Sequence, residues 1–539
     1  MVLQNASGPI GDSTREITQE CDVKVWLVSA LFVVACAAQA AYGWPTVFPT
    51  GTTLYDPELA YNGYVLFVPM GEDAHVVRLI DMNGDVVHEW TFPLFQVIQS
   101  RLLGNGNLLV TGFDPQLKPG RPGVAGLWMG GVAGILMEVS WTNQPLFRHS
   151  DLNMHHDALK LPNGNYLYLA WEPVPLELQA KVRGGIKNSE HRKPPKSLSE
   201  AASDDAFLHA EKVMFNDVVF EINPRGKVVW LWEANKHLDP DVDIIGPVHS
   251  REEWGHANTL NVLANGNILL TSRTLDSILV IDKKTGNVIF RWGNMTRLSK
   301  ESGELELIGK STAQRKHSDT LSGPHGAMEI PRGVPGAGHF VVYDNGIVSR
   351  GALRASRAVE IDPGTGKLVW ESIQKYNEMP VPFGRKHFSD FLGSAQKLPN
   401  GNMLLCDGAN GRFFQMTADR QTVWEYVNPF DKDARFSGSV YKAYCYPPDY
   451  CPQFQEFLPA KGPAVDPAAS DVAGGGRLTV RIGSKRIALS GIEILALSCV
   501  AAIVAFAVGR RWGRRRVVSE LPGGGKPTGA QGRVAKRRN

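Results

Sequence analysis

The sequence has 539 residues, of which 43% are hydrophobic, so the chain is long enough for a large core or several domains. Its formal net charge of +3 at pH 7 is too small to indicate nucleic-acid binding, and the basic excess gathers at the C-terminus. The 6 cysteines include no CxxC pair, which argues against a structural zinc site.

The first hydrophobic segment, residues 25–44 (VWLVSALFVVACAAQAAYGW), carries no charge and is long enough to cross a bilayer. We interpret it as a transmembrane helix or signal anchor that follows a cytoplasmic N-terminal segment, residues 1–24. A cleaved signal peptide is the alternative, because Ala38-Gln39-Ala40 fits a signal-peptidase site. The acidic balance of residues 1–24 favours the uncleaved anchor.

A second hydrophobic segment, residues 487–509, carries only Glu493 and is followed by the arginine cluster GRRWGRRR. Basic residues are retained on the cytoplasmic side of membranes, so we predict a second transmembrane helix with a basic cytoplasmic tail at 510–539. A linker at 456–486 would precede this helix. The region between the two spans would then face the periplasm or the exterior of a cytoplasmic (inner) membrane.

A repeated pair of hairpin motifs runs through the middle of the chain. One motif is a strand–turn–strand unit that usually ends in tryptophan: LIDMNGDVVHEW (79–90), VFEINPRGKVVWLW (219–232), LVIDKKTGNVIFRW (279–292), VEIDPGTGKLVW (359–370) and FQMTADRQTVWEY (414–426), with a degraded copy at 136–149. The other is the tight hairpin L-x-NGN-x-L, at 103–109, 161–167, 263–269 and 398–404, with a longer turn at 330–346.

The two motifs alternate, which gives five complete four-stranded sets and a sixth outer hairpin, expected at 413–426. The strand Gly63–Met70 is expected to complete that last sheet and close a ring, which leaves no exposed sheet edge. We therefore predict an all-β fold: a six-bladed β-propeller over 60–455, flanked by N- and C-terminal transmembrane helices. A β-sandwich is the main alternative, but it does not explain so regular a spacing. Insertions at 113–134, 172–214 and 294–320 are expected to shape the channel mouth.

Three histidines stand at matched places in this frame. His156 precedes LPNGN in the second set, His256 precedes LANGN in the third, and His325 precedes the longer hairpin of the fourth. The inner strands of a propeller line its central channel, so these side chains should converge there. Arg273 should lie across the hairpin from His256, and Asn258 should share a face with it.

Two kinds of chemistry fit this cluster. Three imidazoles could bind a transition metal such as zinc or copper. Alternatively, one could act as nucleophile or acid–base while the others, with Arg273 and Asn258, hold an oxyanion. A guanidinium would repel a dication but suits a tetrahedral anion, so the pattern favours anion chemistry with no metal or other cofactor.

Several other residues receive structural interpretations. We expect His155 to be a scaffold residue, whereas Tyr343 and Asp344 could return toward the site. Cys445 and Cys451 flank a Pro-Pro turn and could form a local disulfide in an oxidising compartment. The tryptophans that end the outer hairpins are expected to pack between blades: Trp90, Trp232, Trp292, Trp370 and Trp424.

The motifs resemble those of the bacterial aryl-sulfate sulfotransferase (arylsulfotransferase) family from about Gly63 to Tyr450. The resemblance rests on HHDALKLPNGN, GHANTLNVLANGNILLTSR, GPHGAMEIPRG with VVYDNG, and a tail that ends in YKAYCYPPDY. It implies a periplasmic six-bladed propeller that transfers a sulfuryl group between phenols without a nucleotide sulfate donor. It also implies that His325 is the nucleophile and forms a sulfohistidine. Roles in binding the sulfuryl oxygens or moving the phenol proton would fall to His156, His256, Asn258 and Arg273.

The functional hypothesis is a membrane-anchored aryl-sulfate sulfotransferase whose partners are phenols, aryl sulfates and the membrane, with no nucleic acid and no cofactor. The alternatives are a non-catalytic ligand-binding or scaffold propeller, an aryl sulfate hydrolase, and a metal- or quinone-dependent propeller enzyme. Soluble members of the family carry an N-terminal β domain used in dimerisation and lack a C-terminal transmembrane helix, so the sequence does not predict the oligomeric state.

Overall fold

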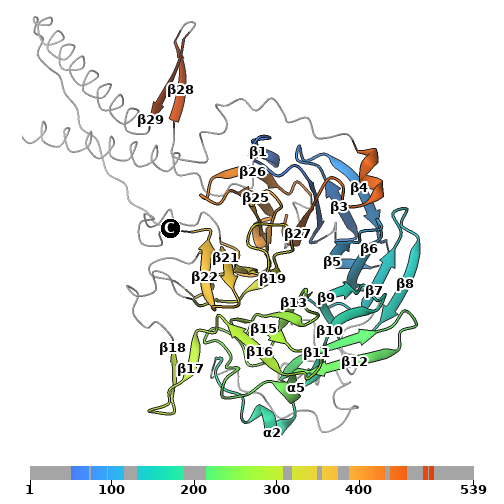
Figure 1. Ribbon diagram of the computed structural model, residues 1–539, viewed down its shortest axis with the longest axis vertical. Helices are drawn as coiled ribbons and strands as arrows, with labels where there is room; N and C mark the ends of the chain where they lie inside the picture. Colours follow the sequence, from blue (N-terminus) through green and yellow to red (C-terminus); the bar gives the residue numbers. More distant parts are fainter. Residues whose placement is uncertain are drawn as a thin grey trace, which may run out of the picture. The chain divides into compact units, whose positions relative to one another are not determined.

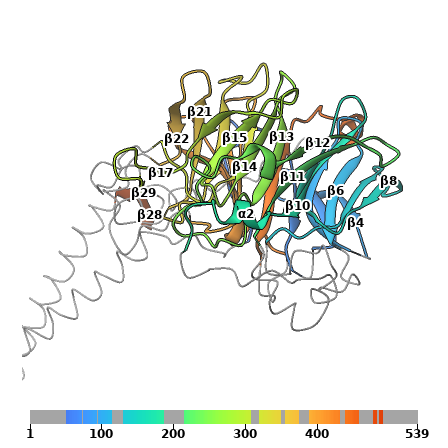
Figure 2. The ribbon, with the colours of Figure 1, turned by 90° about the horizontal axis from the view of Figure 1, so that it is seen from below.

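Six β-sheets stand as blades around a central channel within the unit formed by residues 43–470 (Figure 1). The computed structural model describes residues 50–71, 74–93, 95–113, 130–186, 214–307, 319–348, 355–373, 388–430 and 438–457, and the backbone of 477–482 and 485–490. Seen edge-on, the blades form one layer around the channel (Figure 2). The predicted all-β fold and six-blade count are confirmed.

The first three blades, with strands given from the channel outward, contain the following elements. Blade 1 is formed by β27 (Val440–Tyr446), β2 (Tyr64–Pro69), β3 (Val76–Ile80) and β4 (Val86–Thr91). Blade 2 is formed by β5 (Gln96–Leu102), β6 (Leu108–Phe113), β7 (Ile135–Val139) and β8 (Pro145–Ser150). Blade 3 is formed by β9 (Met154–Lys160), β10 (Tyr166–Pro173), β11 (Phe215–Ile222) and β12 (Val228–Glu233).

The other three blades follow the same plan. Blade 4 is formed by β13 (Ala257–Val262), β14 (Ile268–Ser272), β15 (Ser277–Ile281) and β16 (Val288–Trp292). Blade 5 is formed by β19 (His325–Glu329), β20 (Phe340–Asp344), β21 (Arg357–Asp362) and β22 (Lys367–Glu371). Blade 6 is formed by β23 (Ser394–Lys397), β24 (Met403–Asp407), β25 (Arg412–Met416), β26 (Thr422–Val427) and an added outermost strand, β1 (Gly51–Tyr55).

The ring closes differently from the sequence-based prediction. The hairpin at 413–426 does not lack its inner strands, because β23 and β24 complete its sheet. Instead, β2 joins the outer hairpin of blade 1, and β27 enters that blade as the innermost strand, with Tyr64 opposite Tyr446. In addition, β1 pairs with β26 and lies before the predicted start of the propeller at residue 60. Both ends of the propeller chain therefore take part in closure.

Hydrophobic packing holds each blade to the next. Each of the six interfaces between neighbouring blades has its own cluster of buried apolar side chains. The outer hairpins add a repeated hydrogen bond, because Trp90 donates its indole N–H to Ser140 O on the next blade at 3.2 Å. Equivalent indole bonds to the next blade follow at 2.7–2.9 Å from four tryptophans: Trp232, Trp292, Trp370 and Trp424. The prediction that these tryptophans pack between blades is confirmed.

The two cysteines of the YCYPPDYCP motif are free thiols in the structure, and both are buried. Alternation along β27 turns Cys445 toward the interface of blades 6 and 1, whereas Cys451 packs into the interface of blades 1 and 2. The two thiols therefore belong to different hydrophobic clusters. The suggested Cys445–Cys451 disulfide is not formed.

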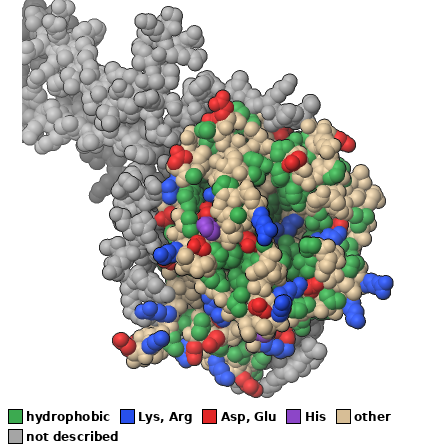
Figure 3. Space-filling view, viewed as in Figure 1, with side chains coloured by type: hydrophobic (Ala, Val, Ile, Leu, Met, Phe, Trp, Pro, Cys, Tyr) green, Lys and Arg blue, Asp and Glu red, His purple; other side chains and the backbone are tan. Residues whose placement is uncertain are grey.

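Several small elements lie between or beside the strands of the blades. They are α2 (Leu176–Gln179), α5 (Ala234–His237), a hairpin of β17 (Thr296–Leu298) and β18 (Leu305–Leu307), and the 3-10 turns η3 (Gly408–Asn410) and η4 (Pro452–Glu456). In Figure 1, α2 and the β17–β18 hairpin lie away from the channel. These described parts of the insertions at 172–214 and 294–320 therefore do not line the channel. On the face shown in Figure 3, basic and hydrophobic side chains meet at a hollow near the centre.

The predicted membrane segments fall almost entirely outside the described residues. This holds for 1–24, for the span at 25–44, for most of the linker at 456–486, and for the tail at 510–539. A hairpin of β28 (Arg477–Ile482) and β29 (Lys485–Ser490) takes in the first four residues of the span predicted at 487–509, and 491–509 lie outside the described part. None of the helices among the described residues has both the length and the apolar character needed to span a bilayer.

Candidate active site

Three histidines from neighbouring blades meet at one end of the channel. His156 lies near the start of β9, His256 directly precedes β13, and His325 is the first residue of β19. The rings of His156 and His256 meet edge to face with centroids 4.8 Å apart, and all three side chains are buried. His325 also lies close enough to His156 for their titrations to interact electrostatically. The structure therefore brings together the three histidines that the sequence placed at matched positions.

Irregular backbone aims these side chains into the channel. The ladders of β9, β13 and β19 each contain a register shift at the histidine end, as a β-bulge produces. His156 and His256 have φ values of 51° and 50°, in the left-handed region that non-glycine residues seldom adopt. Strained conformations of this kind persist only where the surrounding structure enforces them, and they gather at functional sites.

The neighbours of His325 select one tautomer of its ring. Its Nδ1 atom lies 2.7 Å from Asn345 Oδ1 and 3.1 Å from Gly323 O. The Asn345 amide orientation is set because its Nδ2 donates to the backbone oxygens of Ser389 and Leu392, each at 2.7 Å. Both atoms near Nδ1 are thus acceptors, so Nδ1 carries the proton and Nε2 keeps a free electron pair.

Burial and nearby positive charge keep His325 neutral. Burial is the largest cause and, together with the guanidinium of Arg273, holds the pKa of His325 well below its usual value, although the Asn345 contact acts in the opposite direction. A neutral imidazole with a free Nε2 is a nucleophile. The site therefore places a neutral histidine beside the positive charge of Arg273.

A carboxylate that the sequence analysis did not single out orients His256. Glu253 Oε2 contacts His256 Nδ1, and Trp171 Nε1 donates to the other carboxylate oxygen at 2.9 Å. Burial opposes ionisation of Glu253, but the charge of His256 and these hydrogen bonds outweigh it and keep the carboxyl pKa below its usual value. This carboxylate–histidine pair fixes the ring and suits it to proton transfer.

The imidazole of His156 contacts the ring of the preceding residue, His155. Its Nδ1 lies 2.9 Å from Nδ1 of His155, and the His155 ring stacks on Trp171 at 4.4 Å. Burial first, and then the charges of His256 and His155, hold the pKa of His156 well below its usual value. His155 therefore stands where a scaffold residue was expected, although it directly contacts His156. Gly131 approaches the His156 ring so closely that a Cβ atom there would lie 2.2 Å from it.

Arg273 and Asn258 both lie near the cluster but differ in exposure. Arg273 follows β14, donates its backbone N–H to His256 O at 3.1 Å, and makes no side-chain hydrogen bond to the residues that the structure describes. Asn258 is fully buried, and its Nδ2 donates to Pro324 O, beside His325, at 2.8 Å. The guanidinium is thus available to a ligand. The Asn258 amide supports the His325 backbone, and the substrate contact that the resemblance implies stays a prediction.

The closing strand β27 supplies two residues that the sequence analysis did not assign to the site. Tyr441 lies with its ring 5.9 Å from His156 and 6.5 Å from His325, and its hydroxyl donates to Asn258 O at 2.8 Å. Lys442 donates to the same oxygen at 3.1 Å and to Asp157 Oδ2 at 3.3 Å. Burial lowers the pKa of Lys442 to about 8, although Asp157 opposes the shift. The only signal in the sequence was the YKAY segment of the family-like tail.

Of two polar residues predicted with less weight, Tyr343 does return beside His325, its partner across the β19–β20 ladder. Tyr343 is buried in the interface of blades 5 and 6, and Asp344 accepts a hydrogen bond from Arg357 Nε at 2.9 Å. The following residue, Asn345, is the one that reaches His325. Among the described residues, no group of three or more His, Cys, Asp or Glu side chains is arranged to hold a metal ion.

Comparisons with known proteins bear on this geometry. No curated protein sequence matches the chain. Among solved structures, one of a protein of unknown function from Bacteroides caccae is 12% identical over 71% of this chain and 98% of its own, with a TM-score of 0.39. A streptogramin B lyase is 12% identical over 71% of this chain and 83% of its own, with a TM-score of 0.32. An inactive virginiamycin B lyase from Staphylococcus aureus with quinupristin is 10% identical over 69% of this chain and 86% of its own, also with a TM-score of 0.32. Likeness at this level carries no argument about activity.

The family model gives the more specific result. The arylsulfotransferase (ASST) family matches residues 198–447, which begin before β11 and end just after β27. The match includes His256, Arg273 and His325 but not His156. The resemblance read from the motifs is confirmed over these residues, where the chain is similar to the arylsulfotransferase family.

Proposed function

We propose that this protein is a membrane-anchored aryl-sulfate sulfotransferase that works through a sulfohistidine at His325. The observation that carries the proposal is the setting of His325: a neutral ring whose Nδ1 proton is held by Asn345, with Arg273 and two further histidines beside it. The family match supports sulfotransferase chemistry in general. The sulfohistidine mechanism and the phenolic substrates are what the family resemblance implies, and the geometry around His325 is compatible with them.

In the first step, Nε2 of His325 attacks the sulfur of an aryl sulfate, and the bond from sulfur to the phenolic oxygen breaks. The sulfuryl group passes to His325, and the departing phenolate takes a proton from the protonated ring of His256, which Glu253 supports. Arg273 pairs with the sulfuryl oxygens, on which negative charge stays throughout. Transfer without metal or nucleotide needs only a nucleophile, a cation and an acid.

The second step reverses the first with a different phenol. The histidine that gave up its proton now accepts the proton of the acceptor phenol, whose oxygen attacks the sulfur and releases His325. The sum is exchange of a sulfuryl group between two phenols, with no net change in protons. Glu253 keeps the ring of His256 oriented through both steps because it contacts Nδ1 and leaves Nε2 for the phenol.

Attachment to the membrane and an extracytoplasmic propeller are part of the proposal. Their support comes from the sequence: the uncharged run at 25–44, the apolar run at 487–509 and the arginines that follow it. Membrane fractionation, followed by protease treatment of intact and opened cells, tests both. Recovery of the chain in the soluble fraction, or protection of the propeller on the cytoplasmic side, would overturn this part.

The activity is tested with the full chain in detergent and 4-nitrophenyl sulfate, with and without a phenol acceptor. We expect 4-nitrophenol release that depends on the acceptor and is lost in His325→Ala. His339→Ala is the matched control, because His339 belongs to the same blade but pairs with Glu360 outside the histidine cluster. Release that does not need an acceptor would indicate a hydrolase. If the protein binds aryl sulfates but releases no phenol from any of them, it would be a non-catalytic binding propeller.

A further inference from the structure

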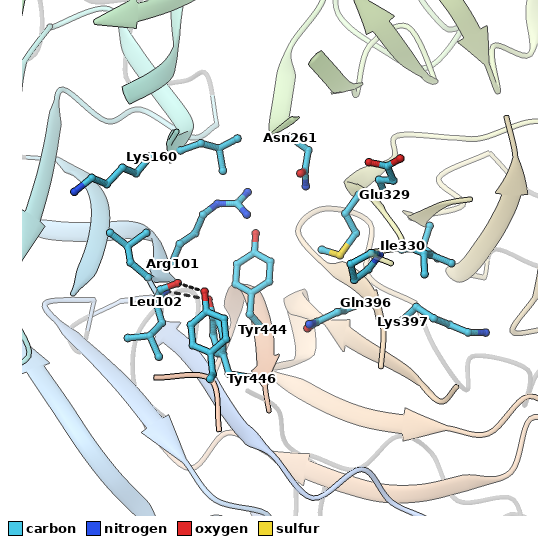
Figure 4. Close-up of a pocket in the computed structure, with 16 residues that line it drawn as sticks. Arg101, Leu102, Lys160, Asn261, Glu329, Ile330, Gln396, Lys397, Tyr444 and Tyr446 are labelled. Atoms are coloured by element: carbon cyan, nitrogen blue, oxygen red, sulfur yellow. Dashed lines mark hydrogen bonds between the residues drawn. The ribbon is translucent and has the colours of Figure 1, made fainter. Parts of the chain in front are cut away.

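A cavity lies at the opposite mouth of the channel from the histidines. It has a volume of about 320 Å³ and is lined by residues near the far ends of the inner strands, including Arg101, Lys160, Asn261 and Tyr444 (Figure 4). None of the residues proposed for sulfuryl transfer lines it. A buried ion pair of Arg101 with Asp157, at 2.8 Å, forms part of the channel between this cavity and the histidine end.

Three hydrogen-bond donors point toward the middle of this cavity. Figure 4 shows Arg101, Tyr444 and Asn261 converging there from three different blades. Arg101 uses Nε and Nη2 on Asp157 and Leu260 O, which leaves Nη1 without a hydrogen bond to the described residues. The hydroxyl of Tyr444 accepts from Gln99 at 2.8 Å, so its own proton is free to be donated.

One atom of the Asn261 amide binds the protein, and the other is left for a ligand in the cavity. Its Oδ1 accepts from the backbone N–H of Val262 at 3.1 Å, whereas its Nδ2 has no hydrogen-bond partner among the described residues. All three convergent groups are therefore donors. The ligand group that they would satisfy is an acceptor, and beside a guanidinium a carboxylate fits best.

The remaining walls are apolar and aromatic. They are formed mainly by Leu102, Leu103, Leu159, Met328, Tyr446 and Tyr450. A cavity of about 150 Å³ is enough to hold benzene, so this one has room for a substituted aromatic ring and some water. Apolar walls with a few convergent polar groups are typical of small-molecule sites.

We propose that this cavity is a second ligand site, distinct from the histidine cluster, that binds a small aromatic carboxylate. The carboxylate lies among Arg101, Tyr444 and Asn261, and the ring packs against the leucine and tyrosine side chains. The site needs no sulfuryl chemistry. It therefore stands independently of the proposed enzymatic activity.

The other charges at this mouth set limits on the ligand. Lys160 and Lys397 point away from the middle (Figure 4) and pair with Glu138 and Glu360 at 2.6 and 3.1 Å. Glu329 is the carboxylate that faces the ligand region, and its Oε2 accepts the backbone N–H of Ala264 at 2.6 Å. Its negative charge weakens the binding of an anion, so its replacement provides a second variant for the test.

The test is a fluorine NMR titration of the full chain with 4-(trifluoromethyl)benzoate, which is neither a sulfuryl donor nor an acceptor. We expect saturable binding that Asn261→Asp weakens at least about tenfold, because a donor becomes a negative charge. The aspartate keeps the acceptor for Val262, so the fold is retained, which a thermal melt verifies. Glu329→Gln should tighten binding several-fold, because the amide oxygen still accepts from Ala264 while the charge is gone.

Two controls locate the binding. His325→Ala should leave the dissociation constant unchanged, and the neutral 4-(trifluoromethyl)benzamide should bind more weakly and respond less to Asn261→Asp. Absence of saturable binding would overturn the proposal. So would binding that is lost in His325→Ala but unaffected by Asn261→Asp and Glu329→Gln, because the probe would then occupy the histidine end. Neither result bears on whether sulfuryl transfer occurs.

Discussion

His325 Nδ1 lies 2.7 Å from Asn345 Oδ1, and this contact determines which ring nitrogen can react. Replacement of Asn345 by alanine removes the acceptor and lets the ring take the other tautomer or turn. We expect Asn345→Ala to lower kcat about 100-fold or more while KM changes little, because loss of the correct tautomer has costs of that order in other histidine-dependent enzymes. Steady-state kinetics with 4-nitrophenyl sulfate measure the effect.

The matched control for this variant is Asn428→Ala. Asn428 is also buried, and its Nδ2 donates to Gly438 O at 2.9 Å, with no hydrogen bond to any of the three histidines. Both variants should lose stability, but only Asn345→Ala should lose activity. Equal loss of activity in the two would show that Asn345 acts only through stability.

The Glu253–His256 pair should matter more as the leaving phenol becomes less acidic. A 4-nitrophenolate departs with little help, whereas an unsubstituted phenolate needs a proton as it leaves. Glu253→Gln removes the charge that orients and supports His256, so its rate should fall more steeply across a series of aryl sulfates with rising phenol pKa. The slope of log kcat/KM against phenol pKa is the measurement.

Glu138→Gln serves as the comparison in that series. Glu138 is a buried carboxylate that binds Lys160 and Tyr166 in another interface. Its replacement should leave the slope as it is in the unmodified chain. A Glu253→Gln slope equal to that of the unmodified chain would mean that His256 does not protonate the leaving group.

Gly131 tests how closely the His156 ring is confined. Its φ is +85°, and an added Cβ would lie 2.2 Å from the ring. Gly164 has φ +86° in a turn of the neighbouring blade, with nothing within 4 Å of the same added atom. Alanine at either position should cost about 1 kcal/mol of unfolding free energy through backbone strain. Only Gly131→Ala should also lower kcat/KM, because His156 must move.

Urea unfolding and kinetics on the two glycine variants give both quantities. Similar losses of stability with activity lost only in Gly131→Ala would place His156 in the reaction. Full activity in Gly131→Ala, with the fold intact, would count against that role.

Acid should destabilise the propeller through its buried neutral histidines. The pKa values of His156 and His325 are lowered in the folded state, mainly by burial, while unfolded histidine titrates near 6.5. Between these values the unfolded chain binds more protons than the folded chain, so stability falls as the pH drops below about 6.5. The slope is at most about 1.4 kcal/mol per pH unit for each such histidine.

Urea denaturation between pH 7.5 and 5 measures this slope. His325→Asn removes one of the titrating groups, so its unfolding free energy should fall less steeply over the same range. An identical slope in His325→Asn would show that His325 does not stay neutral in the folded protein.

The blades and the convergence of the histidines could be predicted because both follow from short-range periodicity. Four blades carry an NGN turn and five carry an outer tryptophan, and these marks indicate which residues begin the inner strands. The closing strand has neither mark, and its partner β2 lies near the other end of the propeller, with Tyr64 opposite Tyr446. Local sequence patterns do not predict the pairing of β27 with β2. The sequence analysis therefore did not place Tyr441 and Lys442, which β27 carries, in the site.

Residues in loops were missed for a related reason. Glu253 and Asn345 reach the histidines from segments without strand periodicity, where side-chain direction depends on tertiary contacts. Asn258 was placed on the correct strand, but the bulge in β13 turns its amide toward Pro324. The sequence thus predicts which strands carry the site better than it predicts which side chains support it.

The position of β27 at the end of the propeller links ring closure to the completion of the site. The strand that seals blade 1 also carries Tyr441 and Lys442 onto Asn258 O, so neither contact exists in a chain that ends before Val440. A chain emerging during synthesis holds all three histidines long before it holds these two residues. The finished histidine site is thus among the last features to form, and unfinished chains cannot reproduce it.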